Sequence, residues 1–544
     1  MTFLEAMIKR VIPEVTWEPS QFVVPWGEEG SVYESIKSFL ETHDRVDSME
    51  DHCVLPDDEE RDSESLTWVA GGIDGSMGHH GSYGEDIVTA RRIARALAGV
   101  LRRPTERRFQ ELYALFEGRK ALSYVDPLLE CLIDDRQFHN TRLHDVAHFF
   151  ATRSPHREVV KTFVAVMGLF ARESDVELFM VLGKHEEFTL YASIAISNSA
   201  REPDDALWEL AKCVDGWGRV QAVERMAGTD NFRIRQWMLR EGYRNSINYE
   251  YLAYTCATTG DLHADLRRPE VDEDLLVGAG DILDAMIRAR SGASMNIFDY
   301  ADGAESVDHY LRHVKESGRA LDEFLIAQTI LEFLKAEDIN WQLQADRGWT
   351  SYRRFQLIKE ADAFVSEEAW SDKIVSGLKS NDELEFGTAV LAAKYLDIDT
   401  WPEFFLRLEK GGAYWSQVMQ TNDTERISRV VELARETFPL EDIGSGPALE
   451  LGVGKKFREH RYLDSIIYEL GRFPGMGICL IKAGLSSPVV RNRVTALRAL
   501  ACWGREWWTK EVIELIQSAQ LREPDKELKS QLARVLRGQP LNGM

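Results

Sequence analysis

Residues 203–242, PDDALWELAKCVDGWGRVQAVERMAGTDNFRIRQWMLREG, decide the fold because they repeat one short pattern three times. Apolar residues recur three, four and seven positions apart over 207–214, again over 220–227, and in shorter form over 232–238. That spacing places apolar side chains on one face of a helix. Glycines separate the repeats, so the stretch predicts three short helices joined by tight turns.

Antiparallel helices joined by such short turns must lie side by side, and a row of such pairs forms an α-solenoid. From residue 121 to 544 short helical patterns alternate with Gly, Asp, Asn or Pro, and the period-2 alternation of a half-buried strand is almost absent. We therefore expect an all-α protein in which residues 121–544 form an irregular helical repeat array.

One repeat near the C-terminus carries a recognisable motif. Residues 487–501 read SPVVRNRVTALRALA, and Arg493, Ala496, Ala499 and Leu500 occupy an R-x-x-A-x-x-A-L pattern after a proline-containing turn. This segment resembles the second helix of the HEAT repeat family. The resemblance covers about forty residues and implies an α-solenoid built from HEAT-like helical pairs.

The composition is that of a folded protein with a strongly uneven charge. The 544 residues include 44% hydrophobic and 28% charged residues, which excludes wholesale disorder, and the net charge is −25. Residues 1–66 hold 17 Asp and Glu against 5 Lys and Arg. We expect three regions: an acidic N-terminal region 1–66, a Gly/His-rich loop with a basic helix over 67–120, and the array 121–544.

The N-terminal sequence carries neither a basic leader nor an apolar export segment, and no apolar run approaches the length of a membrane span, about 20 residues. We therefore expect a cytoplasmic protein that does not engage membranes. The acidic total favours partners with a basic surface and disfavours nucleic acid.

A Gly-rich segment, residues 70–86, reads AGGIDGSMGHHGSYGED. Its six glycines predict an ordered or partly ordered loop and not a helix. Asp74, His79 and His80 are ligand types for zinc or another divalent metal. The alternative is a tight structural turn whose histidines bond neighbouring backbone.

A second metal candidate is His144-Asp145 with His148. Histidines four residues apart share one face of a helix at a spacing that a metal can bridge. The doublet resembles that of HD-type metal phosphohydrolases, a family in which the His and Asp bind metal together with an upstream His and a downstream Asp. The resemblance implies a metal-dependent hydrolase, but no downstream Asp stands in a recognisable motif, and the alternative is a structural helix.

Residues 91–120 hold nine Lys and Arg against three Glu, with apolar residues at helical spacing on one face. The candidate binding residues of this basic helix are Arg91, Arg92, Arg95, Arg102 and Arg103. They could contact nucleic acid. A simpler hypothesis is that this stretch pairs with the acidic residues 41–64 of the same chain.

Repeat arrays produce long binding surfaces, and no motif assembles a nucleophile, a base and an oxyanion donor. We therefore expect a non-catalytic scaffold for a macromolecular partner, such as a basic protein, in an adaptor or immunity-type role without a required cofactor. The alternatives are a metal-dependent hydrolase that uses residues 74–156 and, more weakly, nucleic-acid processing through the basic helix.

Overall fold

The computed structural model describes residues 24–27, 30–42, 53–58, 69–80, 86–135, 138, 141–170, 172–289, 294–317 and 320–540. Across these residues the protein is helical and has no strand, which confirms the predicted all-α, solenoid-like fold. The chain divides into two compact units, Met1–Glu367 and Glu368–Met544. The boundary between them falls inside the stretch 121–544 that the sequence assigns to one array.

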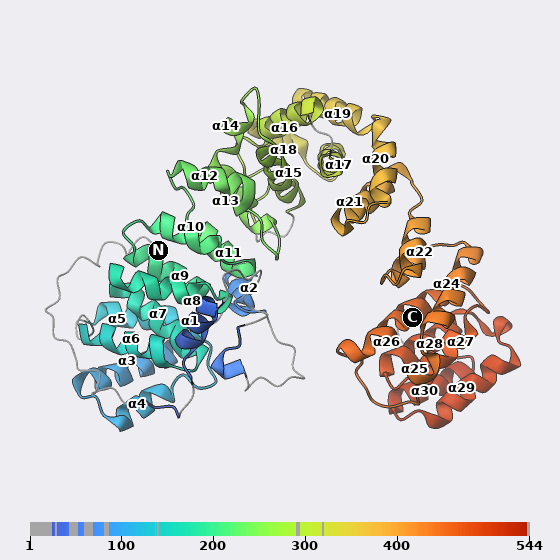
Figure 1. Ribbon diagram of the computed structural model, residues 1–544, viewed down its shortest axis with the longest axis horizontal. Helices are drawn as coiled ribbons and strands as arrows, with labels where there is room; N and C mark the ends of the chain where they lie inside the picture. Colours follow the sequence, from blue (N-terminus) through green and yellow to red (C-terminus); the bar gives the residue numbers. More distant parts are fainter. Residues whose placement is uncertain are drawn as a thin grey trace. The chain divides into compact units, whose positions relative to one another are not determined.

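The first unit contains many short helices (Figure 1). They are α1 (Val32–Thr42), α2 (Gly72–His80), α3 (Ile87–Arg102), α4 (Glu106–Tyr113), α5 (Val125–Asp134), α6 (Thr141–Arg153), α7 (Arg157–Met167), α8 (Val176–Gly183), α9 (Glu186–Ser199), α10 (Pro203–Ala211), α11 (Gly216–Glu224), α12 (Phe232–Trp237), α13 (Glu250–Gly260), α14 (Leu262–Leu266), α15 (Glu273–Arg288), α16 (Gly303–Ser317), α17 (Leu321–Lys335), α18 (Trp341–Gln344) and α19 (Ser351–Val365).

These helices form two packed rows. In the first row, α5, α7, α9, α11, α13, α15, α17 and α19 each pack against the next. Each helix of the second row packs on one helix of the first: α6 on α7, α8 on α9, α10 on α11, α12 on α13 and α16 on α17. Each pair therefore buries its apolar stripe against the following pair, as in a solenoid.

The stretch 203–242 folds as predicted. Its three apolar repeats become α10, α11 and α12, and the last continues as a π-helical turn, Met238–Gly242. Pro203 occupies the first turn of α10, where its missing N–H costs nothing, and Asp204 and Asp205 follow it. Local sequence therefore determines these helices and their boundaries.

The second unit is also two-layered. Its helices are α20 (Ala369–Leu378), α21 (Glu383–Ala393), α22 (Trp401–Glu409), α23 (Trp415–Val418), α24 (Thr424–Thr437), α25 (Leu440–Ile443), α26 (Arg458–Leu470), α27 (Ile478–Leu485), α28 (Val490–Cys502), α29 (Lys510–Arg522) and α30 (Lys526–Leu536). One row runs α23, α26, α28, α30, and the other runs α25, α27, α29.

The motif of residues 487–501 lies on α28, where its small and charged positions have distinct roles. A Cβ atom added to Gly484 would lie 3.2 Å from the Cβ of Ala496, so α27 and α28 approach closely because both residues are small. Arg493 is 1% exposed and binds Glu523 through Nε and Nη2, at 2.8 and 2.7 Å. The described contacts thus explain the motif physically.

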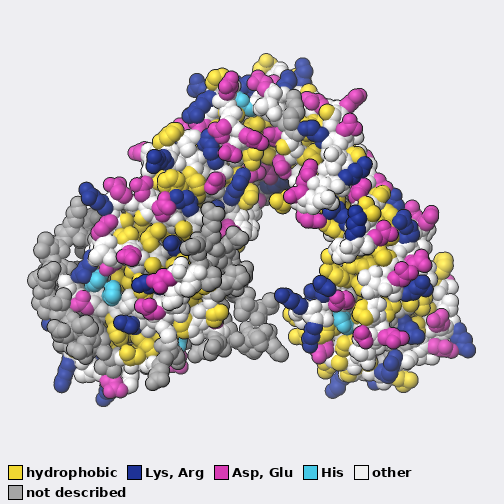
Figure 2. Space-filling view, in the orientation of Figure 1, with side chains coloured by type: hydrophobic (Ala, Val, Ile, Leu, Met, Phe, Trp, Pro, Cys, Tyr) yellow, Lys and Arg dark blue, Asp and Glu magenta, His cyan; other side chains and the backbone are white. Residues whose placement is uncertain are grey.

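Nearly all of the net negative charge belongs to the first unit, although acidic and basic side chains are interspersed on the face that Figure 2 shows. Residues 1–367 hold 65 Asp and Glu against 41 Lys and Arg, whereas residues 368–544 hold 25 against 24. Part of it stabilises helices directly, because acidic side chains occupy the first turns of helices such as α10, α15 and α17, where the helix dipole favours negative charge. Within the described part of the chain, no helix is long and apolar enough to cross a bilayer.

Candidate functional site

The Gly-rich segment contains a helix, so the loop predicted for it is wrong over Gly72–His80. Two of its glycines are needed for packing. A Cβ atom at Gly75 would lie 2.3 Å from Cδ2 of Trp217 on α11, and one at Gly71, which has a positive φ of 66°, would lie 2.6 Å from the carbonyl oxygen of Glu186. Glycine at these positions permits close helix packing, whereas the sequence pattern alone predicts an ordered or partly ordered loop.

Asp74 of α2 points into a buried cluster of charges. Its Oδ2 accepts a hydrogen bond from Nζ of Lys161 on α7 at 2.9 Å, and the same ammonium donates to Oε1 of Glu187 on α9 at 2.7 Å. The second carboxylate oxygen of Glu187 accepts from the N–H of Gly71 at 3.0 Å. The cluster therefore fastens α2 to α7 and α9.

Burial and charge act in opposite directions on these groups. Burial alone would lower the pKa of Lys161, but Glu187, Glu158 and Asp74 raise it, so the ammonium stays charged. Burial would raise the pKa of Glu187, but Lys161 and Arg157 hold it well below its usual range. Burial raises the pKa of Asp74, and Glu158 and Glu187 add to the rise, which Lys161 only partly opposes.

Arg157 at the start of α7 extends the cluster. Its side chain donates to both carboxylate oxygens of Asp57 at distances of 2.8 to 3.1 Å, and to Asp58 at 2.5 Å. The hypothesis that the acidic stretch pairs with the basic helix is therefore wrong for these two carboxylates. They bind α7 instead.

The doublet His144-Asp145 lies on α6, and His144 already has two partners. Its Nε2 lies 2.6 Å from Oδ2 of Asp175, and Nη1 of Arg172 donates to its Nδ1 at 2.9 Å. Because Arg172 can only donate, Nε2 carries the proton that His144 donates to Asp175. His148 lies one turn along α6, with its ring centroid 6.2 Å from that of His144, and burial lowers its pKa.

The candidate metal ligands do not form one centre. Asp74 contacts Lys161, whereas His144 contacts Asp175 and Arg172. The side chains of His79 and His80 lie outside the described residues. In the part of the chain that the structure describes, no group of three or more His, Cys, Asp or Glu could hold a metal ion. The described donors do not fit a divalent metal site.

The predicted basic stretch 91–120 is divided between α3, which ends at Arg102, and α4, and the arginines of α3 lie on its exposed side. Arg91, Arg95 and Arg102 fall within about 40° of one another around the helix axis, and Arg92 and Arg103 lie roughly one further quarter-turn away. All five are exposed. The opposite face is buried against α4 and α5 through Thr89, Ala90, Ile93, Ala94, Leu97, Ala98, Val100 and Leu101.

This arginine face consists of Arg91, Arg92, Arg95, Arg102 and Arg103. Arg91, Arg92, Arg95 and Arg103 form no ion pair with any of the described carboxylates. On α4, by contrast, Arg107 is paired with Glu111 at 2.8 Å, and Arg108 donates to the carbonyl of Gly99 on α3 at 2.8 Å. Exposed guanidinium groups on one side of a helix can bind an anionic surface bidentately.

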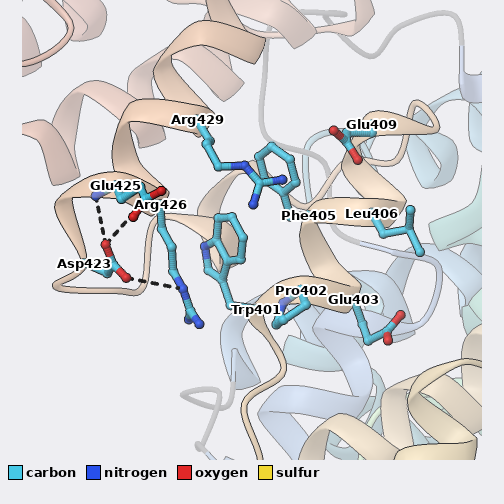
Figure 3. Close-up of a pocket in the computed structure, with 10 residues that line it drawn as sticks. All are labelled: Trp401, Pro402, Glu403, Phe405, Leu406, Glu409, Asp423, Glu425, Arg426 and Arg429. Carbon is cyan, nitrogen blue, oxygen red and sulfur yellow. Dashed lines mark hydrogen bonds and ion pairs between the residues drawn. The ribbon is translucent and has the colours of Figure 1, made fainter.

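A groove of about 500 Å³ in the second unit was not predicted (Figure 3). It is lined by Trp401, Pro402, Glu403, Phe405, Leu406 and Glu409 of α22 and by Asp423, Glu425, Arg426 and Arg429 of the α24 side. Its volume lies in the usual range of ligand sites, roughly 300 to 1,000 Å³.

Two stacked aromatic rings in the groove are covered by arginine side chains. Trp401 and Phe405 stack with centroids 4.8 Å apart, and the indole N–H of Trp401 donates to the carbonyl of Val418 at 2.8 Å. The guanidinium of Arg429 lies 4.3 Å from the Phe405 centroid, and that of Arg426 lies 4.9 Å from the Trp401 centroid. Both rings are buried, with 7% and 4% of Trp401 and Phe405 exposed, so the guanidinium groups cover the ring faces in the groove.

Two signals could have pointed to these features. Lys161 interrupts the otherwise apolar run of α7, and a lysine in a buried helix needs a carboxylate partner. Arg426 and Arg429 lie three apart on α24 and so share a face. The partners themselves lie far away in the sequence and could not be found in this way.

No protein-family model matches the chain, and no curated protein is similar to it. Among solved structures, an engineered protein from the Northeast Structural Genomics Consortium is similar at 15% identity, over 82% of this chain and 98% of that chain. Its TM-score of 0.21 does not establish a common fold.

Proposed function

We propose that this chain is a non-catalytic helical-repeat protein that binds a macromolecular partner. The observation that carries the proposal is the arginine face of α3: five exposed arginines on one side of a helix whose other side is buried. Four of these cations, Arg91, Arg92, Arg95 and Arg103, pair with no described carboxylate and so can meet an acidic partner. We infer that the partner presents an acidic segment to α3.

The HEAT-like resemblance supports the same proposal, because α-solenoids commonly bind partners along their repeats. The partner with a basic surface that the overall charge favours would bind elsewhere. Glu270, which precedes α15, and Glu273 and Asp274 in the first turn of α15 are exposed carboxylates of the acidic first unit. The described His and carboxylate groups supply no observation in favour of metal-dependent hydrolysis.

Affinity capture from the native host tests the proposal. The immobilised full chain is compared with Arg91→Glu/Arg92→Glu/Arg95→Glu and with Lys526→Glu/Lys529→Glu/Arg537→Glu, a matched control on exposed residues of the second unit. We expect a stoichiometric partner on the wild-type and control chains, weaker capture as salt increases, and loss from the α3 variant. Equal recovery on all three chains would contradict a role for α3.

Nuclease treatment of the same extract separates protein from nucleic acid as the partner. A protein captured equally with and without nuclease supports the scaffold proposal. Recovery that depends on nucleic acid would instead favour contact between the guanidinium groups and phosphates.

A further inference from the structure

The segment that joins α25 to α26 in the second unit (Figure 1) carries three exposed aliphatic residues at alternate positions. Leu449 is 63% exposed, Leu451 83% and Val453 74%. Single exposed apolar residues are ordinary on protein surfaces, but three within five residues form a concentrated apolar patch. Their high exposure means that they stand out from the surface instead of lining a groove.

The backbone of this segment is held in place, so the exposure is a fixed feature of the fold. The backbone N–H of Glu450 donates to the carbonyl of Pro488, and the carbonyl of Glu450 accepts from the N–H of Val490, at 3.2 Å each. These bonds form a parallel bridge between Glu450 and Val489 of the turn 488–490. Nη1 of Arg461 donates to the carbonyl of Gly454 at 2.8 Å. Gly452 has a φ of 78°, and a Cβ atom there would lie 2.7 Å from a side-chain carbon of the same turn.

Cationic side chains follow the apolar patch directly. Lys455, Lys456, Arg458 and Arg461 are exposed, and the two lysines form no ion pair with a described carboxylate. Residues 450–537 hold 16 Lys and Arg against 10 Asp and Glu, the opposite sign to the whole chain. Charges beyond the Debye length of about 8 Å are screened, so the local sign determines which surfaces approach this segment.

We infer that residues 449–461 form a docking surface for an anionic lipid bilayer. Leu449, Leu451 and Val453 would enter the interface, and Lys455 and Lys456 would lie at the level of the phosphate groups. A bilayer accepts protruding aliphatic side chains, whereas a peptide partner is usually held in a groove. None of the described helices spans a membrane, so the contact would be peripheral.

Vesicle co-sedimentation of the purified full chain tests this inference. The probes are vesicles of phosphatidylcholine alone and of an equimolar mixture with phosphatidylserine. We expect binding to the mixed vesicles that is at least about tenfold stronger than to phosphatidylcholine and that weakens with salt. Leu451→Asp/Val453→Asp should abolish it, and Lys455→Glu/Lys456→Glu should reduce it about tenfold or more.

Leu384→Asp is the matched control, because Leu384 on α21 is also 83% exposed but has no basic neighbours in sequence comparable to Lys455 and Lys456. It should leave binding unchanged, and all variants should keep the wild-type helix content. Wild-type protein that fails to bind the mixed vesicles overturns the inference. An equal loss of vesicle binding in Leu384→Asp also overturns it. Binding of an alternating glutamate–valine peptide without vesicle binding overturns it too, because it would indicate a peptide site. None of these outcomes bears on capture through α3.

Discussion

The Nζ atom of Lys161 lies 2.9 Å from Oδ2 of Asp74, inside the first unit and out of contact with solvent. The two residues are 87 positions apart. Asp74, a candidate metal ligand in the sequence, therefore serves with Glu187 as the counter-charge of a buried ammonium. This contact joins the N-terminal segment to the repeat array.

Removing the ammonium should destabilise the first unit strongly. In Lys161→Met the carboxylates of Asp74 and Glu187 remain buried without a cation, and breaking a buried pair in this way costs about 3 to 5 kcal/mol. We expect calorimetry of the full chain to show a lower Tm for the first unit only. The control is Lys482→Met, an exposed lysine on α27, and an unchanged first-unit Tm in Lys161→Met would contradict a stabilising role for the cluster.

Gly75 of α2 gives a second prediction, because close packing against Trp217 leaves no room for a side chain there. Gly75→Ala places a Cβ 2.3 Å from the Trp217 ring, so α2 must move away from α11 at a cost of about 1 to 3 kcal/mol. Gly387 on α21 is the matched control, since nothing lies within 4 Å of an added Cβ. There the same change should stabilise the helix by about 0.5 to 1 kcal/mol. Opposite shifts in Tm are the expected result, and stabilisation by Gly75→Ala would show that α2 does not pack as described.

Local pattern was sufficient for much of the fold and insufficient for the charge cluster. The helices of 203–242 and the exposed arginines of α3 follow from residues within one or two turns of each other. From the sequence, Gly75 is interpreted as a loop residue, because its packing against Trp217 is a long-range contact. Asp74 is likewise interpreted as a metal ligand, because its hydrogen bond from Lys161 is also long-range. Lys161 within the apolar run of α7 signals that a carboxylate partner is needed, but the sequence does not show which carboxylate it is, or that Trp217 meets Gly75. The groove over Trp401 likewise requires α22 and α24 to be brought together.

His185 should make the stability of the first unit depend on pH. It is buried at the start of α9, where burial lowers its pKa to about 4, and its Nδ1 accepts a hydrogen bond from the N–H of Glu187 at 3.3 Å. Between pH 4 and the ordinary value of 6.5 the unfolded chain binds a proton that the folded chain does not. Stability contributed by the neutral ring is therefore full above pH 6.5 and falls by about 3 kcal/mol as the pH drops to 4.

The variant His185→Asn isolates this effect. Asparagine keeps an acceptor for the start of α9 but cannot titrate. The raised pKa of Asp74 acts in the opposite direction, because its contribution is lost as pH rises, and it is present in both proteins. The difference in first-unit urea stability between wild type and variant should therefore shrink from pH 7 to pH 4.5. A difference that stays constant with pH would mean that His185 is protonated in the folded chain.

The buried ion pair between Arg493 and Glu523 tests the role of the arginine in the R-x-x-A-x-x-A-L motif of α28. Both side chains are 1% exposed, and Nη1 of Arg493 also donates to the carbonyls of Ser487 and Pro488, so the arginine joins α28, the turn before it and the segment after α29. Arg493→Met leaves the carboxylate of Glu523 buried without a cation, which should lower the free energy of unfolding of the second unit by about 3 to 5 kcal/mol.

Arg493→Met/Glu523→Met removes both charges and should recover part of that loss, because no charge is then left buried alone. The double variant should still be less stable than wild type, since the carbonyls of Ser487 and Pro488 lose their donor. A double-mutant cycle on the second-unit Tm measures the coupling, and strictly additive losses would show that the two charges do not depend on each other.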